Sequence, residues 1–213
     1  MEISVKELRR MATAVDEQHR AAMRTFREET AELHLGAAAR LSLSDVDIAV
    51  FAESVELAAV AVYTDSDVAK LVTPDIAAVA QLFAQHHSDH AAAFASLSGG
   101  KATGKANAPI VKTYTDTLKP TLKSQTDVLK LAAVVEHQAA STYAFALTAL
   151  QSVDAAAGTA TILPVEAEHA ILLGAALGQG LDELFPTGAF VSASVGALGD
   201  PKIGIDPTKY PVA

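Results

Sequence analysis

The chain contains no cysteine and no tryptophan, and only 5% of its 213 residues are aromatic. Without thiols it can form no disulfide bond, thiolate zinc site, iron–sulfur cluster or cysteine nucleophile. Any bound metal ion must therefore be held by oxygen and nitrogen atoms. The scarcity of aromatic residues, together with abundant alanine and a hydrophobic share of 50%, favours closely packed helices over a sheet sandwich. The composition predicts an all-α protein.

Positive charge and long apolar runs are also scarce. The 16 lysine and arginine residues face 25 acidic residues, and the formal charge is −9. This balance argues against a nucleic-acid partner and against docking on an anionic lipid surface. The longest apolar runs, such as residues 57–63, are far shorter than the roughly 20 residues that cross a bilayer. We expect no membrane span and, for the sequence as given, a cytoplasmic protein; an exported location is expected if a signal segment belongs in front of it.

Two flanking segments differ from the central part of the chain. Residues 1–43 begin with a capping-box pattern at Ser4 and continue with apolar residues at helical spacing, which predicts an amphipathic helix added to the main domain. Its apolar stripe suggests packing on the main domain or a homodimer contact, with a solvated arm as the alternative. Residues 185–213 carry prolines and glycines at short intervals and predict an extended arm.

The central part, residues 44–184, predicts four helices. The expected helices run from Ser44 past Tyr63, over 73–96, over 120–153, and from between 159 and 164 to 184. Residues 98–109 are expected to form a flexible crossover, and Gly158 is expected to separate the third helix from the fourth. Four helices with one long connection predict a four-helix bundle with one long crossover.

A repeat supports this arrangement. A seven-residue step from glutamate to tyrosine occurs twice, from Glu56 and from Glu136, and a histidine motif follows each step. His90 lies 34 residues after Glu56, and His169 lies 33 residues after Glu136. We interpret the repeat as a duplicated helical hairpin.

The repeat also indicates a metal site. A glutamate ion on an alanine-rich helical face costs several kcal/mol to bury unless a cation or a hydrogen-bond donor meets it. Lysine and arginine are absent from residues 71–100 and 131–201, so a divalent metal is the expected partner. A three-residue spacing places both members of a pair on one helical face, where they can bind a common ion. The predicted ligands are Glu56, His87, His90, Glu136, Glu166 and His169.

Each of these residues alone also fits an ordinary hydrogen-bonded or surface role, and the interpretation depends on the ordered set. His86, His137 and Glu168 adjoin predicted ligands but point about 100° away around their helices, which predicts surface or supporting roles. Tyr63 and Tyr143 fit core rings with a satisfied hydroxyl as well as they fit a role beside the metal.

At this point the chain resembles the ferritin-like superfamily, in particular the bacterial ferritin-like domain family related to rubrerythrins and desiccation-associated proteins. The resemblance covers about residues 45–184. It is carried by Glu56 with Tyr63, by His87-Ser88-Asp89-His90, by Glu136 with Tyr143, and by residues 162–170, which include Glu166 and His169.

The resemblance implies a centre of two iron or manganese ions with tyrosines beside it. It implies that Glu56 and His90 bind one ion, that Glu136 and His169 bind the other, and that Glu166 bridges the two. The tyrosines implied to lie beside the centre are Tyr63 and Tyr143.

The chain departs from the family pattern at His87, where the family has a second bridging glutamate. The six predicted ligands therefore supply three carboxylates and three imidazoles. We expect a single ion, an asymmetric pair, or a site adapted to zinc or another metal that prefers nitrogen. Glu53, one turn before Glu56, is the better substitute for the missing carboxylate, while Asp89 is expected to face solvent.

These features predict a ferritin-like metal protein that oxidises Fe(II) with dioxygen or peroxide. Such an activity is that of a ferroxidase or peroxidase-type oxidoreductase in iron oxidation or in a bacterial stress response. The alternatives are a non-enzymatic structural or stress-protection protein without a working site, and a carrier of a single ion. Storage in a large shell is not expected, because the added terminal segments differ from a compact shell subunit.

Overall fold

The computed structural model describes residues 43–180 and 211–212. All of the described elements are helices, which confirms the all-α prediction. None of these helices is long and apolar enough to cross a bilayer. The N-terminal helix predicted for residues 1–43, its dimer contact, and the arm predicted for residues 185–213 lie outside the described residues except at their margins.

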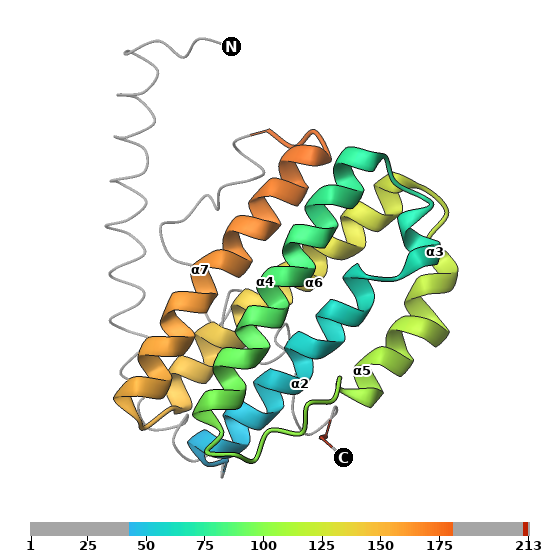
Figure 1. Cartoon of the computed structure of the whole chain (residues 1–213). Helices are drawn as coiled ribbons and strands as arrows, with labels where there is room; N and C mark the ends of the chain where they lie inside the picture. The colour runs from blue at the N-terminus through green and yellow to red at the C-terminus, as the bar shows by residue number, and fades with distance from the viewer. Residues whose placement is uncertain (1–42, 181–210, 213) are drawn as a thin grey trace, which may run out of the picture.

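Four long helices lie side by side and form the body of the molecule (Figure 1). They are α2 (Asp45–Tyr63), α4 (Pro74–Leu97), α6 (Gln125–Ala149) and α7 (Val153–Ala176). Helix α2 packs mainly on α4, and α6 packs mainly on α7, while α4 also contacts α7. The short helix α3 (Ser66–Ala69) joins α2 to α4. The bundle therefore consists of two helical hairpins, as the repeat predicts.

Capping side chains fix where the helices start. Ser44 and Asp47 form a capping box in which the Asp47 N–H donates to Ser44 Oγ at 3.2 Å and the Ser44 N–H donates to Asp47 Oδ2 at 3.0 Å. Ser124 caps α6 and Ser152 caps α7. Pro74 occupies the start of α4, where its missing N–H is not needed. The predicted starts of the first two long helices are confirmed.

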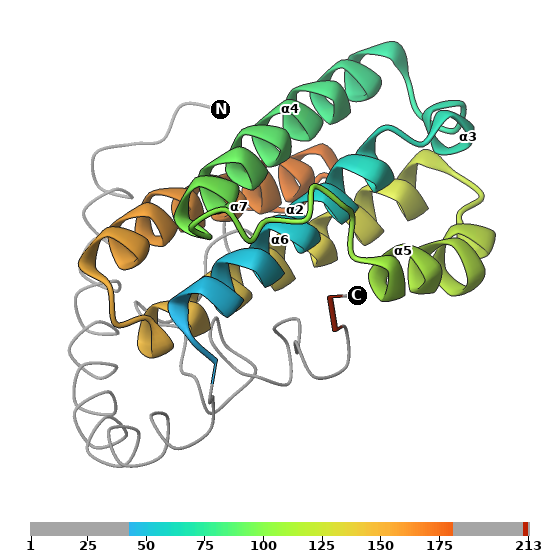
Figure 2. The same ribbon diagram turned by 60° about the horizontal axis from the view of Figure 1, so that its bottom comes forward.

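The connection between the hairpins is longer and more ordered than the predicted crossover. Between α4 and α6 it contains α5 (Ala108–Thr113), the π-helical turn η1 (Tyr114–Leu118) and the 3-10 turn η2 (Lys119–Thr121). Helices α4 and α6 run in the same direction, so the connection returns along the bundle beside α2 (Figure 2). The Asn107 N–H donates to the Ser54 carbonyl at 2.8 Å and fastens this connection to α2.

The boundary between the third and fourth helices differs from the prediction. Helix α6 ends at Ala149 and α7 begins at Val153, so Gly158 and Pro164 lie inside α7. A Cβ atom at Gly158 would lie 3.2 Å from Leu97 Cδ1, so the glycine permits close packing of α7 against the end of α4. Pro164 leaves the Ala160 carbonyl without its helical donor, and Ala160 is exposed, so water can take the place of that donor. Gly158 does not interrupt the helix, because tertiary packing outweighs the low helix propensity of glycine.

The end of the fourth helix also differs. The sequence predicts a helix to Leu184, but α7 ends at Ala176. Gly178 has a φ of 80°, a left-handed conformation that glycine adopts without a steric penalty. The Gln179 N–H then donates to the Gly174 carbonyl at 3.1 Å, which satisfies an acceptor at the helix terminus.

A polar layer crosses the bundle between two apolar clusters. On α4, His87 and His90 lie between Phe83 and Phe94, which belong to different clusters. One cluster contains Ala52, Phe94, Ala139, Tyr143 and Ile162, and the other contains Phe83, Leu129 and Leu173. The apolar layers supply the hydrophobic stabilisation that holds charged groups in the interior.

Candidate metal centre

The polar layer brings together all six predicted ligands, with contributions from each of the four long helices. They are Glu56 of α2, His87 and His90 of α4, Glu136 of α6, and Glu166 and His169 of α7. Five of these side chains are at most 3% exposed, whereas that of His90 is 11% exposed. His90 is therefore the edge of the cluster that is most accessible to solvent.

The ligand atoms form two overlapping groups of four, and within each group they lie within 4.8 Å of one another. The first group comprises Glu56, His87, His90 and Glu166. The second group comprises His87, Glu136, Glu166 and His169. His87 and Glu166 belong to both groups, so two ions held by these groups would be neighbours.

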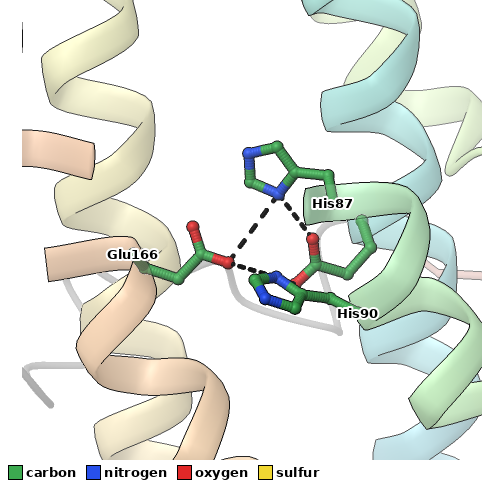
Figure 3. Close-up of side chains that lie close together, drawn as sticks. His87, His90 and Glu166 are labelled. Atoms are coloured by element: carbon green, nitrogen blue, oxygen red, sulfur yellow. Dashed lines mark hydrogen bonds and ion pairs between the residues drawn. The ribbon is translucent and has the colours of Figure 1, made fainter. Parts of the chain in front are cut away.

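In the first group, the nitrogens come from α4 and the oxygens from α2 and α7. His87 Nδ1 lies 2.6 Å from Glu56 Oε2 and 3.7 Å from Glu166 Oε1. His90 Nδ1 lies 2.8 Å from Glu166 Oε1 and 3.8 Å from Glu56 Oε1. Figure 3 shows the imidazoles of His87 and His90 directed towards the carboxylate of Glu166 across the bundle.

The second group uses the other donor atom of each shared residue, Nε2 of His87 and Oε2 of Glu166. His87 Nε2 lies 3.3 Å from Glu136 Oε1. His169 Nδ1 lies 3.2 Å from Glu136 Oε2 and 3.5 Å from Glu166 Oε2. Each group therefore contains two carboxylates and two imidazoles.

Three buried atoms of this cluster have no hydrogen-bond partner among the described residues: His90 Nδ1 and the two carboxylate oxygens of Glu166. His90 Nδ1 approaches Glu166 Oε1 to 2.8 Å, but the two groups are not oriented as a hydrogen bond. Buried polar atoms are nearly always satisfied, and an unsatisfied one costs roughly 1–3 kcal/mol. A cation placed between these atoms would satisfy them, so the residues present fit a metal.

Imidazoles are the cationic partners of the three carboxylates in the described part of the chain, where no lysine or arginine pairs with them. Burial acts to lower the pKa of His87, but Glu136 and Glu56 outweigh it and hold the pKa well above its ordinary value. For His90, Glu166 and Glu56 likewise outweigh burial and raise the pKa to about 9. Without a metal, protonated imidazoles neutralise this layer.

The three carboxylates differ in the hydrogen bonds that they receive. Burial raises the pKa of Glu166 above its ordinary value. Burial also acts to raise the pKa of Glu56 and Glu136, but hydrogen bonds from the histidines outweigh it and lower both. Glu166 is thus the carboxylate with the least protein stabilisation and the most to gain from a cation.

The two tyrosines contact the glutamates of opposite hairpins. The Tyr63 hydroxyl donates to Glu136 Oε1, and the Tyr143 hydroxyl donates to Glu56 Oε1. Burial raises the pKa of both phenols well above the ordinary value, so both remain neutral donors. The tyrosines therefore orient Glu56 and Glu136, the two glutamates that belong to only one donor group each.

The structure places Glu53 away from the two donor groups. Its carboxylate accepts hydrogen bonds from the N–H groups of Thr103 and Gly104, each at 2.9 Å. Glu53 is buried and anchors the start of the crossover connection to α2. Asp89 is exposed and accepts a hydrogen bond from Gln85 at 2.9 Å. The prediction of Glu53 as a substitute ligand did not take into account that the N–H groups of the crossover need an acceptor.

His86 of α4 contacts the cluster through one of its members, His169 of α7. Its Nδ1 lies 2.9 Å from His169 Nε2, and the two rings stack with centroids 5.2 Å apart. A proton on His169 Nε2, donated to His86, leaves His169 Nδ1 free to bind an ion. His86 precedes His90 by four residues and therefore shares its helical face, and this spacing could have indicated from the sequence that His86 lies near the cluster. His137 and Glu168 are exposed.

An apolar cavity of about 340 Å³ lies at the end of the bundle near α3. Tyr63 and Phe83 line it. The same two rings stack on the cluster, Tyr63 on His87 with centroids 5.4 Å apart and Phe83 on His169 with centroids 3.8 Å apart. One layer of aromatic rings therefore separates the cavity from the candidate metal centre.

Comparison with known proteins agrees with this architecture. The chain matches the ferritin-like domain family over residues 44–179, a range that contains the four long helices and all six predicted ligands. Neither the curated proteins nor the solved structures contain a match. The family match covers more than half of the chain and coincides with the bundle and its buried cluster of histidine and glutamate. The chain belongs to the ferritin-like domain family.

Proposed function

We propose that this chain binds two iron ions in the polar layer of its bundle and acts in iron oxidation or in defence against peroxide. The observation that carries the proposal is the pair of overlapping donor groups that share His87 and Glu166. The unsatisfied buried atoms of His90 and Glu166 support it, because a bound cation would supply the partner that they lack.

The two hairpins supply equivalent ligands. Glu56 and His90 would hold one ion, and Glu136 and His169 would hold the other. Glu166 would contact both, because Oε1 belongs to the first group and Oε2 to the second. Imidazole suits iron and zinc better than it suits manganese. Three imidazoles therefore favour iron over manganese and make zinc the main competitor.

When bound, two Fe(II) ions can give one electron each to hydrogen peroxide, which takes up two protons and becomes two water molecules. The protein's own contribution is to hold the ligands and exclude other reactions. Tyr63 and Tyr143 fix one oxygen of Glu136 and Glu56, respectively. The burial of five ligands keeps bulk water out, and the accessible edge at His90 is where a small oxidant can enter.

His87 favours a second candidate, a ferritin-like protein with one ion or none. The family pattern has a carboxylate at this position, and a protonated imidazole can itself neutralise the neighbouring glutamates. A structural or stress-protection role would then need no redox chemistry.

Metal analysis separates the two candidates. Protein purified without chelator should contain about two metal ions per chain, one for each donor group. Addition of Fe(II) to the metal-free chain, followed by peroxide or dioxygen, should produce ferric absorbance rapidly. Glu136→Gln should slow this reaction, while Glu168→Gln, on an exposed neighbour of the cluster, should leave it unchanged. One inert ion, or none, would support the second candidate.

A further inference from the structure

We propose that His87 bridges the two ion positions through its two ring nitrogens and so takes the place of the second bridging carboxylate. This inference rests on the proposed two-ion centre. It assigns His87 a different role from His90 and His169, which would each bind one ion through one nitrogen.

The two nitrogens of His87 face different groups. Nδ1 lies 2.6 Å from Glu56 Oε2, an atom of the first group, and Nε2 lies 3.3 Å from Glu136 Oε1, an atom of the second. Its nitrogens point to opposite sides of the five-membered ring. An imidazole between two cation positions can therefore serve both of them.

Glu166 shows the same division of donor atoms. Oε1 lies 2.8 Å from His90 Nδ1 in the first group, while Oε2 lies 3.5 Å from His169 Nδ1 in the second. Both residues that the groups share thus present one atom to each group. By contrast, the contacts of His90 and His169 with the carboxylates involve Nδ1 alone. The bridging arrangement is therefore specific to His87 and Glu166.

The surroundings of His87 hold its ring between the two positions. The side chain is 1% exposed and stacks on Tyr63 at an interplanar angle of 19°. Its centroid lies 6.0 Å from that of His90 and 5.6 Å from that of His169, with interplanar angles of 89° and 68°. Rotation of the ring would break the stack on Tyr63 and both carboxylate contacts, so the bridging orientation is preorganised.

A bridging imidazole has consequences for protons and for metal preference. The ring must release every N–H proton to solvent when both nitrogens bind ions. Each position then has two nitrogen and two oxygen ligands, a set that suits zinc, iron, copper or nickel better than manganese. Exchange of His87 for glutamate would shift both positions towards metals that prefer oxygen.

Nitrogen NMR of the full chain tests this directly. Histidine labelled with nitrogen-15 would be incorporated, the metal removed with a chelator, and zinc added as the probe. We expect two zinc ions per chain and one imidazole that has lost the proton on both nitrogens, while the ligands His90 and His169 keep one N–H each. The doubly bound signal should disappear in His87→Glu and persist in His137→Gln, a variant of an exposed histidine.

The outcomes separate the two proposals. Two zinc ions per chain with one N–H retained on every ligand imidazole would overturn the bridge and leave the two-ion centre intact. Fewer than two zinc ions per chain would overturn both. His87→Glu gives a second criterion if its fold is preserved by circular dichroism: the ratio of zinc affinity to manganese affinity should fall at least tenfold, and an unchanged ratio would contradict the bridge.

Discussion

The hydroxyl of Tyr143 on α6 donates a hydrogen bond to the carboxylate of Glu56 on α2. The equivalent tyrosine of the first hairpin, Tyr63, donates to Glu136 of the second. Each hairpin thus supplies a donor to the glutamate of the other. The polar layer therefore holds the two hairpins in register in addition to positioning the predicted ligands.

Removal of either hydroxyl should destabilise the metal-free protein. Tyr143→Phe and Tyr63→Phe keep the rings but take a donor from a buried carboxylate, a loss of about 1–3 kcal/mol each in the free energy of unfolding. Urea unfolding followed by circular dichroism measures this loss. Tyr114→Phe is the comparison variant, because it removes a hydroxyl that donates to Asp65 outside the polar layer and so measures what one such hydrogen bond contributes elsewhere in the fold. A loss below about 0.5 kcal/mol in both variants, the range of neutral surface changes, would contradict the crossed arrangement.

Glu166→Ala should remove most of the bound metal, because Glu166 gives one oxygen to each donor group. The fold should remain helical, since the two apolar clusters on either side of the polar layer are unchanged. Elemental analysis and circular dichroism measure the two effects. Glu168→Ala, exposed on the same helix, should keep its metal. Full metal content in Glu166→Ala would refute a bridging role.

The convergence of the six predicted ligands could be predicted from sequence because helix geometry fixes their register. A step of three residues places His87 with His90, or Glu166 with His169, on one face wherever the helix begins or ends. The repeat supplied the remaining information, since equivalent hairpins must meet at equivalent depths. An error of several residues in the bounds of α7 therefore did not displace the cluster.

The remaining features depend on contacts between elements. Gly158 lies inside a helix because Leu97 packs close to it, and no local pattern contains that neighbour. The adjacency of α4 and α7 decides what His86 contacts. Glu53 shares the periodicity of a ligand, yet the crossover backbone lies near enough to take its carboxylate. Sequence periodicity predicts which side chains share a helical face. It does not predict which residues of other elements those side chains contact.

Glu53→Gln should weaken the fold without changing metal content. The neutral amide is a poorer acceptor for the Thr103 and Gly104 N–H groups, and hydrogen bonds to a charged group contribute about 1.5–3 kcal/mol. We expect a lower urea midpoint and the same number of ions per chain. Asp89→Asn, at an exposed position on α4, is the control. Loss of metal from Glu53→Gln with stability unchanged would instead place Glu53 in the centre.

Asp65 should make stability depend on pH in the acid range. Burial acts to raise its pKa, but Lys119 at 2.8 Å, backbone N–H groups and the Tyr114 hydroxyl outweigh it, so the folded pKa lies below the ordinary 3.8. A depressed pKa stabilises the fold fully above the unfolded value, and this contribution is lost as the pH falls through the folded pKa. Asp65→Asn can still cap α3 but lacks the charge.

The difference in unfolding free energy between wild type and Asp65→Asn should therefore be constant near neutral pH and shrink below about pH 4. Urea unfolding across this range measures it in both proteins. A difference that grows as the pH falls would reverse the sign and refute the assigned contacts.

His86→Ala should weaken one ion position more than the other. His86 accepts from His169 Nε2 in our assignment, so its loss leaves the orientation and proton position of His169 unfixed. Loss of such a partner typically lowers metal affinity about 10–100-fold. The position formed with Glu136 and His169 should show this loss, while the position formed with Glu56 and His90 should change less. Zinc titration against a competing chelator would resolve the two steps.

A conservative variant distinguishes this positioning role from simple packing. His86→Gln keeps a side-chain oxygen that can accept the His169 Nε2–H, so it should recover most of the affinity that alanine loses. His137→Ala, at an exposed histidine of α6, should leave both steps unchanged. Equal weakening of both steps in His86→Ala and His86→Gln would show that the ring of His86 acts through packing alone. Two unchanged steps in His86→Ala would show that the 2.9 Å contact does not position His169.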